Sequence, residues 1–423
     1  MRLPSGYIDK TAWARDATPR SLYRAPVHRW FVFPHSYSHT LVETIIEAWK
    51  LNPGDCILDP FVGAGTTLVV AKDRGIPAVG LDVSPLAVMV SQVKTADYDA
   101  DDLTAGWQRV RACVPKVPPQ TSPHGSPLVR RAFTPTAWRW LAALRDSILS
   151  VQEWSHRDFL QVAYLRTMRE VCRALSDGGW LRWTRRRPSG ADLLKRMDRT
   201  VAMMIADVRT VASRQSPVTS RQLLAAGRWP LSWDVLQGDA RFLPKDLGKV
   251  TAVICSPPYP NRHDYSRVFA PELLLAFCDE DELKRLRYTS FRSHVEARDP
   301  GCPIDGYVPP PKLQATLRRL SRAPVTNPRV IPMVEGYFSD TFLMLRALRP
   351  HLVKGARLAF VVGNVRHAGI MVEVDEYLAQ IAEDLGYRHE GSWVIRLRGN
   401  SAQQMEKFGR VPARESVVLL RWQ

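Results

Sequence analysis

The stretch Asp59-Pro-Phe-Val-Gly-Ala-Gly-Thr-Thr67 directly follows the apolar run Cys56-Ile57-Leu58. An apolar run followed by an acidic, glycine-bearing loop and a second apolar stretch predicts a strand, a turn and a helix. A second apolar run, Val250 to Cys255, ends in the tetrapeptide Ser256-Pro-Pro-Tyr259. These two strand ends decide the fold class and the position of the expected site.

Further apolar runs repeat this arrangement along the chain. A helix is predicted for Thr66–Arg74, where Gly75 and Pro77 end it. Strands that alternate with helices are typical of a parallel sheet with helices on both faces. We therefore expect an α/β fold with a doubly wound, Rossmann-like sheet and a helical insertion domain. Further strands are expected at Ala78–Val83, Trp233–Gln237, Leu358–Val362, Trp393–Leu397 and Val417–Trp422.

Two stretches interrupt the alternation and predict insertions. Residues 101–231 are helical in pattern after a proline-rich start, and we interpret 101–135 as a linker. Residues 271–334 contain a second stretch rich in proline and arginine. We expect residues 1–100, 232–270 and 335–423 to form the catalytic domain, with 101–231 as a basic helical insertion for target recognition. The second insertion is a candidate for further contacts with nucleic acid.

The chain is strongly basic, with 59 Lys and Arg against 42 Asp and Glu and a formal net charge of +17. Residues 130–230 hold 19 of the basic and 8 of the acidic side chains, so a surplus of 11 charges lies in about a quarter of the chain. A basic surface binds polyanions because binding releases condensed counterions. This concentration predicts a nucleic-acid-binding lobe. A merely solvated helical surface is the alternative.

The loop after Asp59 has the features of a nucleoside site. Gly63 and Gly65 let the backbone approach a ligand, and the amides of the following helix favour an electron-rich group. Asp82 and Asp239 follow other strands, which places acidic side chains at the carboxyl edge of the sheet. Three acidic strand ends suit a cationic, adenosine-bearing ligand better than a pyrophosphate. Helix N-capping is the alternative for Asp82 and Asp239.

The tetrapeptide Ser256–Tyr259 has the chemistry to hold a flat ring and its amino group. Two successive prolines fix φ and remove amide donors, which leaves carbonyl acceptors at the loop. A carbonyl and the Ser256 oxygen can accept both hydrogens of an exocyclic amine and favour a localised lone pair on its nitrogen. Tyr259 offers a face for stacking a base, worth about 1–3 kcal/mol. A proline-stiffened turn with a packed tyrosine is the structural alternative.

In these two motifs the chain resembles the site-specific DNA amino-methyltransferases of the cytosine-N4/adenine-N6 group. Asp59–Thr67 is similar to the cofactor motif and Ser256–Tyr259 to the catalytic motif, within roughly residues 25–95, 233–270 and 335–423. The resemblance implies a methyltransferase sheet, S-adenosylmethionine as methyl donor and double-stranded DNA as partner. A tetrapeptide that begins with serine is associated mostly with the N4 amine of a flipped cytosine.

The resemblance also implies roles for individual residues. The expected catalytic residues are Ser256, Pro257, Pro258 and Tyr259. The residues expected to bind the cofactor are Asp59, Pro60, Phe61, Gly63, Gly65, Thr66, Asp82 and Asp239. A restriction endonuclease that acts separately is a candidate partner.

Arginines near the tetrapeptide and in the basic insertion are the candidates for DNA contacts. Arg262 and Arg267 follow the tetrapeptide and are expected at the mouth of the site. His263 between them is a weaker candidate for a general base than for packing. Aromatic residues and arginines alternate in the insertion, and arginine can contact guanine in the major groove. The candidates there are Arg182, Arg185, Arg186 and Arg187.

Other features exclude several classes of protein. The six cysteines form no Cys-x-x-Cys pair, so we expect neither a metal site nor a disulfide framework. An apolar run long enough to span a membrane is absent from the sequence, and we expect a cytoplasmic protein of prokaryotic or phage origin. Cytosine-C5 transfer is rejected because Cys255 lies inside a predicted strand. Adenine-N6 transfer, RNA base methylation and an inactive DNA-binding protein stay as alternatives.

Overall fold

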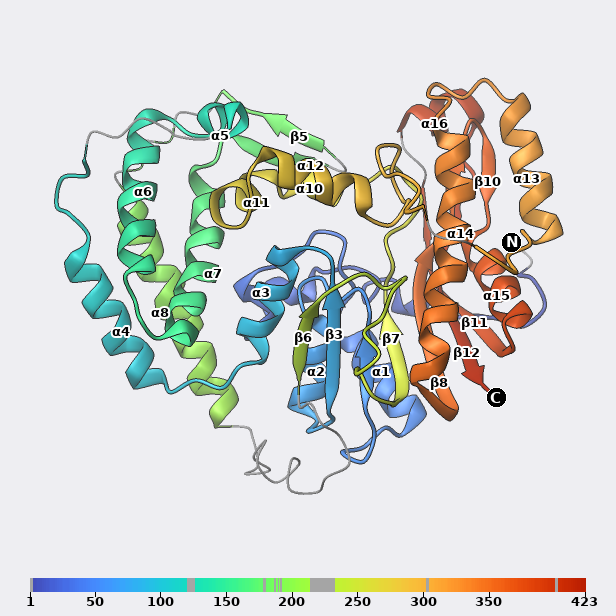
Figure 1. The fold of residues 1–423 in the computed structure, drawn as a ribbon, viewed down its shortest axis with the longest axis horizontal. Coiled ribbons are helices and arrows are strands. Elements are labelled where there is room, and N and C mark those ends of the chain that lie inside the picture. Colours follow the sequence, from blue (N-terminus) through green and yellow to red (C-terminus); the bar gives the residue numbers. More distant parts are fainter. Residues whose placement is uncertain are drawn as a thin grey trace.

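The computed structural model describes residues 3–119, 126–177, 180–185, 188, 190, 192–213, 233–301, 304–399 and 402–423. Its centre is an eight-stranded sheet in the order β1-β11-β12-β8-β7-β2-β3-β6 (Figure 1). These strands are β1 (Tyr7–Asp9), β2 (Ile57–Asp59), β3 (Ala78–Asp82), β6 (Asp234–Gln237), β7 (Val250–Cys255), β8 (Leu352–Gly363), β11 (Tyr387–Arg398) and β12 (Ala413–Trp422). The predicted α/β class with a doubly wound sheet is confirmed.

The strands from β8 to β6 run parallel, whereas β12 runs antiparallel between β8 and β11. Alternate residues of a strand face opposite layers. In β2, Ile57 packs in the cluster that contains α1 (His39–Trp49) and α2 (Thr66–Asp73), whereas Leu58 packs with α14 (Val330–Leu348) and α15 (Val374–Asp384). The sheet is therefore buried between two helical layers.

The basic insertion forms a helical lobe at one side of the sheet (Figure 1). It packs on α3 (Pro85–Thr95) through a shared apolar core. Its elements are α4 (Ala100–Cys113), α5 (Pro127–Ala132), α6 (Pro135–Leu149), α7 (Trp154–Val171), α8 (Leu193–Ala212) and the hairpin of β4 (Ala174–Asp177) and β5 (Trp180–Trp183).

The linker expected at 101–135 is wrong, because two helices occupy much of it. Leu103, Trp107 and Val110 are buried on one face of α4, and their spacing is that of a helix packed on a core. Asp99 caps α4 by accepting hydrogen bonds from the amides of Asp101 and Asp102. The prolines lie beyond the C-terminus of this helix.

After the tetrapeptide and through the second inserted region, the chain forms short helices that pass above the sheet and a longer one beyond its far edge (Figure 1). Near α14 lie a small hairpin and the C-terminal helix. These elements are α10 (Tyr265–Val268), α11 (Ala270–Ala276), α12 (Glu280–Thr289), α13 (Pro311–Arg322), β9 (Val365–His367), β10 (Ile370–Val372) and α16 (Ala402–Phe408). Single 3-10 turns are η1 (Thr11–Trp13), η2 (Ser21–Tyr23), η3 (His28–Trp30) and η4 (Arg349–His351).

Asp207 of α8 ties the N-terminal segment to the helical lobe. Its buried carboxylate accepts hydrogen bonds from the Val27 amide at 3.1 Å and the Trp30 indole at 3.0 Å, and it pairs with Arg29 at 2.5 Å. A carboxylate that lost such partners would be costly to bury, so the three donors fix the segment against the lobe. The same segment begins at β1, which pairs with β11.

Within the described ranges, no helix is long and apolar enough to cross a membrane. Nor do three or more His, Cys, Asp or Glu side chains of these ranges gather as a metal site requires.

Candidate active site

Two loops that are far apart in the chain meet at the carboxyl edge of the sheet. β2 and β7 are parallel neighbours, with Leu58 opposite Val253, so the loops after them emerge on the same side. Residues 60–64 line one cavity together with Ser256 and Pro258. We call it the glycine-loop cavity.

The walls of the glycine-loop cavity are aromatic and acidic. The rings of Phe33 and Phe269 lie in its lining with their centroids 4.4 Å apart, and Phe61 lines it as well. Asp82 and Asp239 supply carboxylates, and the described residues of the lining include no Lys or Arg. Such walls favour a flat apolar group joined to polar and cationic parts.

Gly63 and Gly65 shape the loop in different ways. Both have left-handed backbone angles, φ +50° at Gly63 and φ +78° at Gly65, which most other residues adopt at a cost. A Cβ at Gly65 would also lie 3.0 Å from the Ser91 hydroxyl oxygen, which itself donates a hydrogen bond to the Gly63 carbonyl. Gly63 lines the cavity, whereas Gly65 lies at the start of α2, behind the lining.

Asp82 links the glycine loop to the end of β3. Its two oxygens accept hydrogen bonds from the amides of Gly63 at 3.0 Å and Ser84 at 2.9 Å. Burial raises the pKa of Asp82 to about 6. A carboxylate offers about four acceptor positions, so the backbone amides leave capacity for a ligand in the cavity. The capping and ligand-binding interpretations of Asp82 are therefore compatible.

Asp59 lies behind the cavity rather than in its lining. Its side chain is buried and accepts hydrogen bonds from the Phe61 amide at 3.1 Å and the Tyr37 hydroxyl at 3.2 Å. Burial raises the pKa of Asp59 to about 7. Pro60, Phe61 and Thr66 line the cavity, so the contacts of Asp59 hold the loop while its neighbours face the ligand space.

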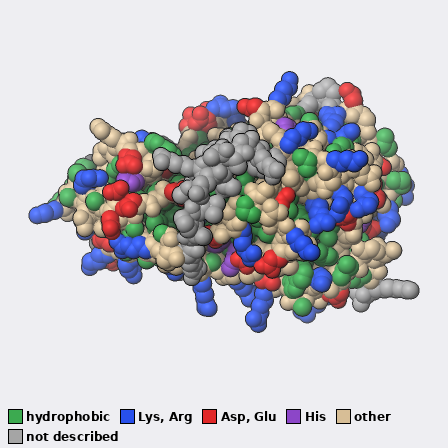
Figure 2. Space-filling view, turned by 90° about the horizontal axis from the view of Figure 1, so that it is seen from below, with side chains coloured by type: hydrophobic (Ala, Val, Ile, Leu, Met, Phe, Trp, Pro, Cys, Tyr) green, Lys and Arg blue, Asp and Glu red, His purple; other side chains and the backbone are tan. Residues whose placement is uncertain are grey.

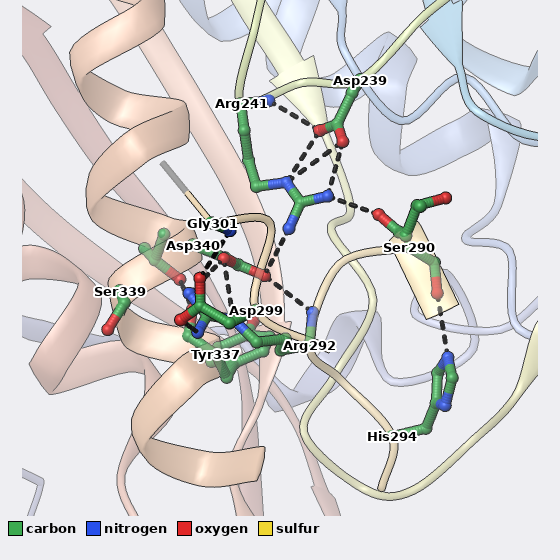
Figure 3. A network of polar contacts seen from close by, with 12 residues as sticks. Asp239, Arg241, Ser290, Arg292, His294, Asp299, Gly301, Tyr337, Ser339 and Asp340 are labelled. Carbon is green, nitrogen blue, oxygen red and sulfur yellow. Dashed lines mark hydrogen bonds and ion pairs between the residues drawn. The ribbon is translucent and has the colours of Figure 1, made fainter. Parts of the chain in front are cut away.

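A buried ionic network holds Asp239, as Figure 3 shows. Arg241 pairs with Asp239 at 2.6 Å and with Asp340 of α14 at 3.0 Å, and it also donates to the Thr289 carbonyl. Asp340, which is fully buried, pairs in turn with Arg292 at 2.7 Å. The network joins the cavity wall to α14 and to the segment after α12.

A second pocket shares Ser256 with the glycine-loop cavity, and we call it the tyrosine pocket. Pro257 and Tyr259 line it, so the tetrapeptide separates two ligand spaces. The Ser256 hydroxyl donates a hydrogen bond to the Val361 carbonyl of β8 at 3.0 Å. Other described residues common to both linings are His35, Ser36 and Tyr265.

The environment of Tyr259 fixes its ring. The hydroxyl donates a hydrogen bond to Glu415 at 3.1 Å, and the Arg398 guanidinium lies 5.2 Å from the ring centroid. Burial and then the Glu415 carboxylate hold the pKa of Tyr259 well above its usual range. A Cβ at Gly363 would lie 2.9 Å from the Tyr259 ring, so Gly363 leaves the space that this ring occupies.

The charged residues of the tyrosine pocket have no counterpart in the sequence predictions. This pocket is lined by Arg20, by Arg396 and Arg398 of β11, and by Glu415 of β12. Arg396 and Arg398 are two positions apart on a strand, and Glu415 pairs with Arg396 across the ladder. Strand alternation was a signal that these side chains share a face, but the sequence alone does not show that the face borders a ligand space.

Cys255 and His263 have the properties of packed residues. Cys255 is fully buried, and burial followed by the nearby Asp59 raises the pKa of its thiol well above the usual range. A protonated, inaccessible thiol is not a nucleophile. Burial lowers the pKa of His263 to about 3, and its ring packs against His35 and Tyr265.

The arginines proposed to contact DNA fall into two groups. Arg262 is exposed and lines a polar groove. This groove adjoins the tyrosine pocket, because Asn261 and Arg398 line both. Arg267 is half-buried on α10, and this helix contacts β5, whose Arg182 is exposed. Arg185 is also exposed. Arg186 and Arg187 lie outside the described residues.

Basic side chains are not confined to one end of the molecule. On the face in Figure 2, Lys and Arg lie over both ends, with Asp and Glu among them. The surplus of basic residues in the insertion therefore forms one part of a wider basic surface.

Comparisons with known proteins agree with these motifs. A family model described as a DNA methylase matches residues 8–92. The chain is 26% identical to the Type II methyltransferase M.BsoBI of Geobacillus stearothermophilus, over 93% of this chain and 85% of that protein. It is 28% identical to the Type II methyltransferase M.AvaI of Nostoc sp., over 94% of this chain and 86% of the relative. A likeness to the crystal structure of TrmN from Thermus thermophilus is loose, with a TM-score of 0.29 and 13% identity over 91% of this chain and 49% of that one.

Proposed function

Since this chain is a methyltransferase of the DNA amino-methyltransferase group with cytosine-N4 and adenine-N6 members, we propose that it methylates the N4 amine of a cytosine everted from duplex DNA. Transfer to adenine N6 is the alternative within the same group. S-adenosylmethionine is the methyl donor of these enzymes and supplies an electrophilic methyl group.

The observation that carries the proposal is the junction at Ser256. The glycine-loop cavity and the tyrosine pocket share this residue, and the tetrapeptide contributes to both linings. A methyl donor in one space and a base in the other would approach each other at the tetrapeptide. Holding the two reactants in this way removes much of the entropic cost of their encounter.

The residues of the glycine-loop cavity fit S-adenosylmethionine. The rings of Phe33, Phe61 and Phe269 suit the flat adenine, and Asp82 has free acceptor positions for ribose hydroxyls. The carboxylate of Asp239 adds negative charge for a cationic ligand. We propose that Pro60, Gly63 and Thr66 complete the contact surface, while Asp59 and Gly65 keep the loop in place.

We propose that the tetrapeptide orients the target amine. Pro257 and Pro258 lack amide donors, so the loop presents acceptors to an amine that carries two hydrogens. Tyr259 stacks on the everted base, and its stacking offsets part of the few kcal/mol that eversion costs. The amine nitrogen is then held with its lone pair directed at the glycine-loop cavity, with water excluded.

Two observations support cytosine over adenine. The tetrapeptide begins with serine, the form associated mostly with cytosine N4. In addition, Asn261, Arg396 and Arg398 bring hydrogen-bond donors to the tyrosine pocket. Cytosine presents two acceptors, N3 and O2, beside its amine on the pairing edge, whereas adenine presents one. A pocket rich in donors therefore fits the cytosine edge better.

DNA recognition by both inserted regions, 101–231 and 271–334, belongs to this proposal, with Arg182, Arg185, Arg262 and Arg267 as contacts. The contact of α11 with α5 supports a shared surface from the two regions, and α10, which carries Arg267, contacts β5 beside it. A cytoplasmic location and a separately acting restriction endonuclease complete the proposed setting.

The test is expression in a host that lacks DNA methylation, followed by modification-sensitive sequencing and mass spectrometry of the nucleosides. We expect N4-methylcytosine within one short sequence. N6-methyladenine instead would move the assignment to the alternative, and unmodified DNA would refute the proposal. The variants Ser256→Ala and Tyr259→Ala should suppress the modification while S-adenosylmethionine still binds in calorimetry.

A further inference from the structure

Glu415 occupies an unusual position for an acidic side chain. It lies near the start of β12, where it pairs with Gly363 of β8 on one side and Arg396 of β11 on the other. Its exposed fraction is only 6%, yet its side chain lines the tyrosine pocket together with Ser256 and Pro257. A carboxylate buried at this depth normally has partners for both oxygens.

Among the described residues, only one Glu415 oxygen has a hydrogen-bond partner. Oε1 accepts the Tyr259 hydroxyl proton at 3.1 Å. Oε2 is buried and has no hydrogen-bond partner among the described residues. The Arg396 guanidinium lies 3.6 Å from Oε2, close enough for charge attraction but too far for a hydrogen bond. A carboxylate oxygen without a hydrogen-bond partner therefore lies beside the tetrapeptide.

We propose that Oε2 of Glu415 accepts an N–H of the exocyclic amine of the everted base, which makes Glu415 a catalytic residue. The inference rests on the proposed function, since it concerns the same base. A base stacked on Tyr259 lies next to the residue that Tyr259 itself contacts. An acceptor there fixes the rotation of the base in the pocket and keeps electron density on the amine nitrogen.

A purely structural role for Glu415 would have different consequences. In that case the carboxylate only balances Arg396 across the β11–β12 ladder and anchors the Tyr259 hydroxyl. Removal of Arg396 would then harm the protein as much as removal of the Glu415 charge. The direct contact that we propose depends instead on the amine of the substrate.

The first test uses wild-type protein and needs no variant. A duplex that contains the sequence identified in the methylation-free host is compared with one whose target base lacks its exocyclic amine, and in both the target base lies opposite an abasic site so that eversion costs the same. We expect the amine-free duplex to bind roughly tenfold or more weakly, since a hydrogen bond to a charged acceptor is lost. Equal binding of the two duplexes would overturn the inference.

The second test uses Glu415→Gln, which keeps the shape and an acceptor for Tyr259 but brings an amide donor toward the amine. We expect roughly tenfold or greater slowing of single-turnover methyl transfer, with unchanged affinity for S-adenosylmethionine, and equal affinity for both duplexes. Arg396→Gln, the matched control, should retain the preference for the amine-containing duplex.

Two results would overturn the inference in this second test. One is a Glu415→Gln variant that transfers methyl groups at the wild-type rate, and the other is an Arg396→Gln variant with the same loss of amine preference. Wild-type protein that modifies no DNA would instead refute the proposed function, which separates the two failures.

Discussion

The glycine-loop cavity and the tyrosine pocket meet at Ser256 but differ in their charged residues. The first has Asp82 and Asp239 in an aromatic wall, without Lys or Arg in its described lining. The second is lined by Arg20, Arg396 and Arg398 with a single carboxylate, Glu415. The difference is consistent with the proposed function, in which the first space holds a cationic ligand and the second a base attached to a polyanion.

The largest expected effect is a loss of kcat on substitution of Gly363, which lies beside the tyrosine pocket and not in the lining of the glycine-loop cavity. In Gly363→Ala, the new Cβ would meet the Arg398 guanidinium first and would also lie 2.9 Å from the Tyr259 ring, so both groups must move, and a misplacement of about 1 Å can cost about 100-fold in rate. We expect a kcat loss of that order with unchanged affinity for S-adenosylmethionine, measured by steady-state kinetics and calorimetry. Gly106→Ala in α4 is the control, because its Cβ would meet only the His156 ring at an ordinary 3.5 Å. A Gly363→Ala enzyme with normal kcat would contradict the proposal that the tyrosine pocket positions the base.

The converse change acts on the acidic wall. Asp239→Asn removes the negative charge while Arg241 keeps its pairing with Asp340. We expect S-adenosylmethionine to bind about tenfold more weakly, as for the loss of a charged hydrogen bond, with kcat unchanged at saturation. Calorimetry measures the affinity. Unaltered binding would show that Asp239 serves the Arg241 network alone.

Acidification should weaken cofactor binding through Asp82. Because burial raises its pKa to about 6, affinity should fall by up to about tenfold per pH unit below that value. The stability of the cofactor-free protein should depend on pH in the opposite direction. Its Asp82 pKa lies above the ordinary value, so this group's contribution to stability decreases as the pH rises from about 4 to 6. Binding titrations from pH 5 to 8 measure the effect, and Asp82→Asn should flatten the profile.

The smallest predicted effect concerns the lobe outside both spaces. Arg185→Ala should reduce the salt slope of DNA binding by about 0.9, the value for one lost phosphate contact, and leave cofactor affinity unchanged. Fluorescence anisotropy between low and physiological salt measures that slope. A slope equal to the wild-type value would move DNA recognition away from the end of β5.

The meeting of the two loops was predictable, whereas the composition of the tyrosine pocket was not. Parallel strands end at one edge, so Gly63 and Ser256 could be placed together from apolar runs alone. Glu415 follows an arginine at the start of a strand, and its chemistry depends on Arg396 and Tyr259, which local pattern does not bring near it. Likewise, the contact of Arg241 with Asp340 joins two segments of the expected catalytic domain, and these residues are 99 positions apart in the chain.

The misread linker at 101–135 has a local cause. The prolines after α4 favour a linker, whereas the helical spacing of Leu103, Trp107 and Val110 predicts the helix that the structure shows. By contrast, the strand ends at Asp59 and Cys255 agree with the prediction, because an apolar run precedes each and prolines follow closely. Prolines therefore mark where an element ends, whereas apolar spacing indicates which element precedes them.

The contacts of the N-terminal segment also constrain the order in which the nascent chain acquires its structure. The hydrogen bonds of Val27, Arg29 and Trp30 can form only after Asp207 has been synthesised. In the same way, β1 can pair only after β11 has been synthesised. This segment is translated before its partners and is thus among the last to dock. During translation it stays available to chaperones, and the finished enzyme gains its edge strand only when most of the polypeptide has left the ribosome.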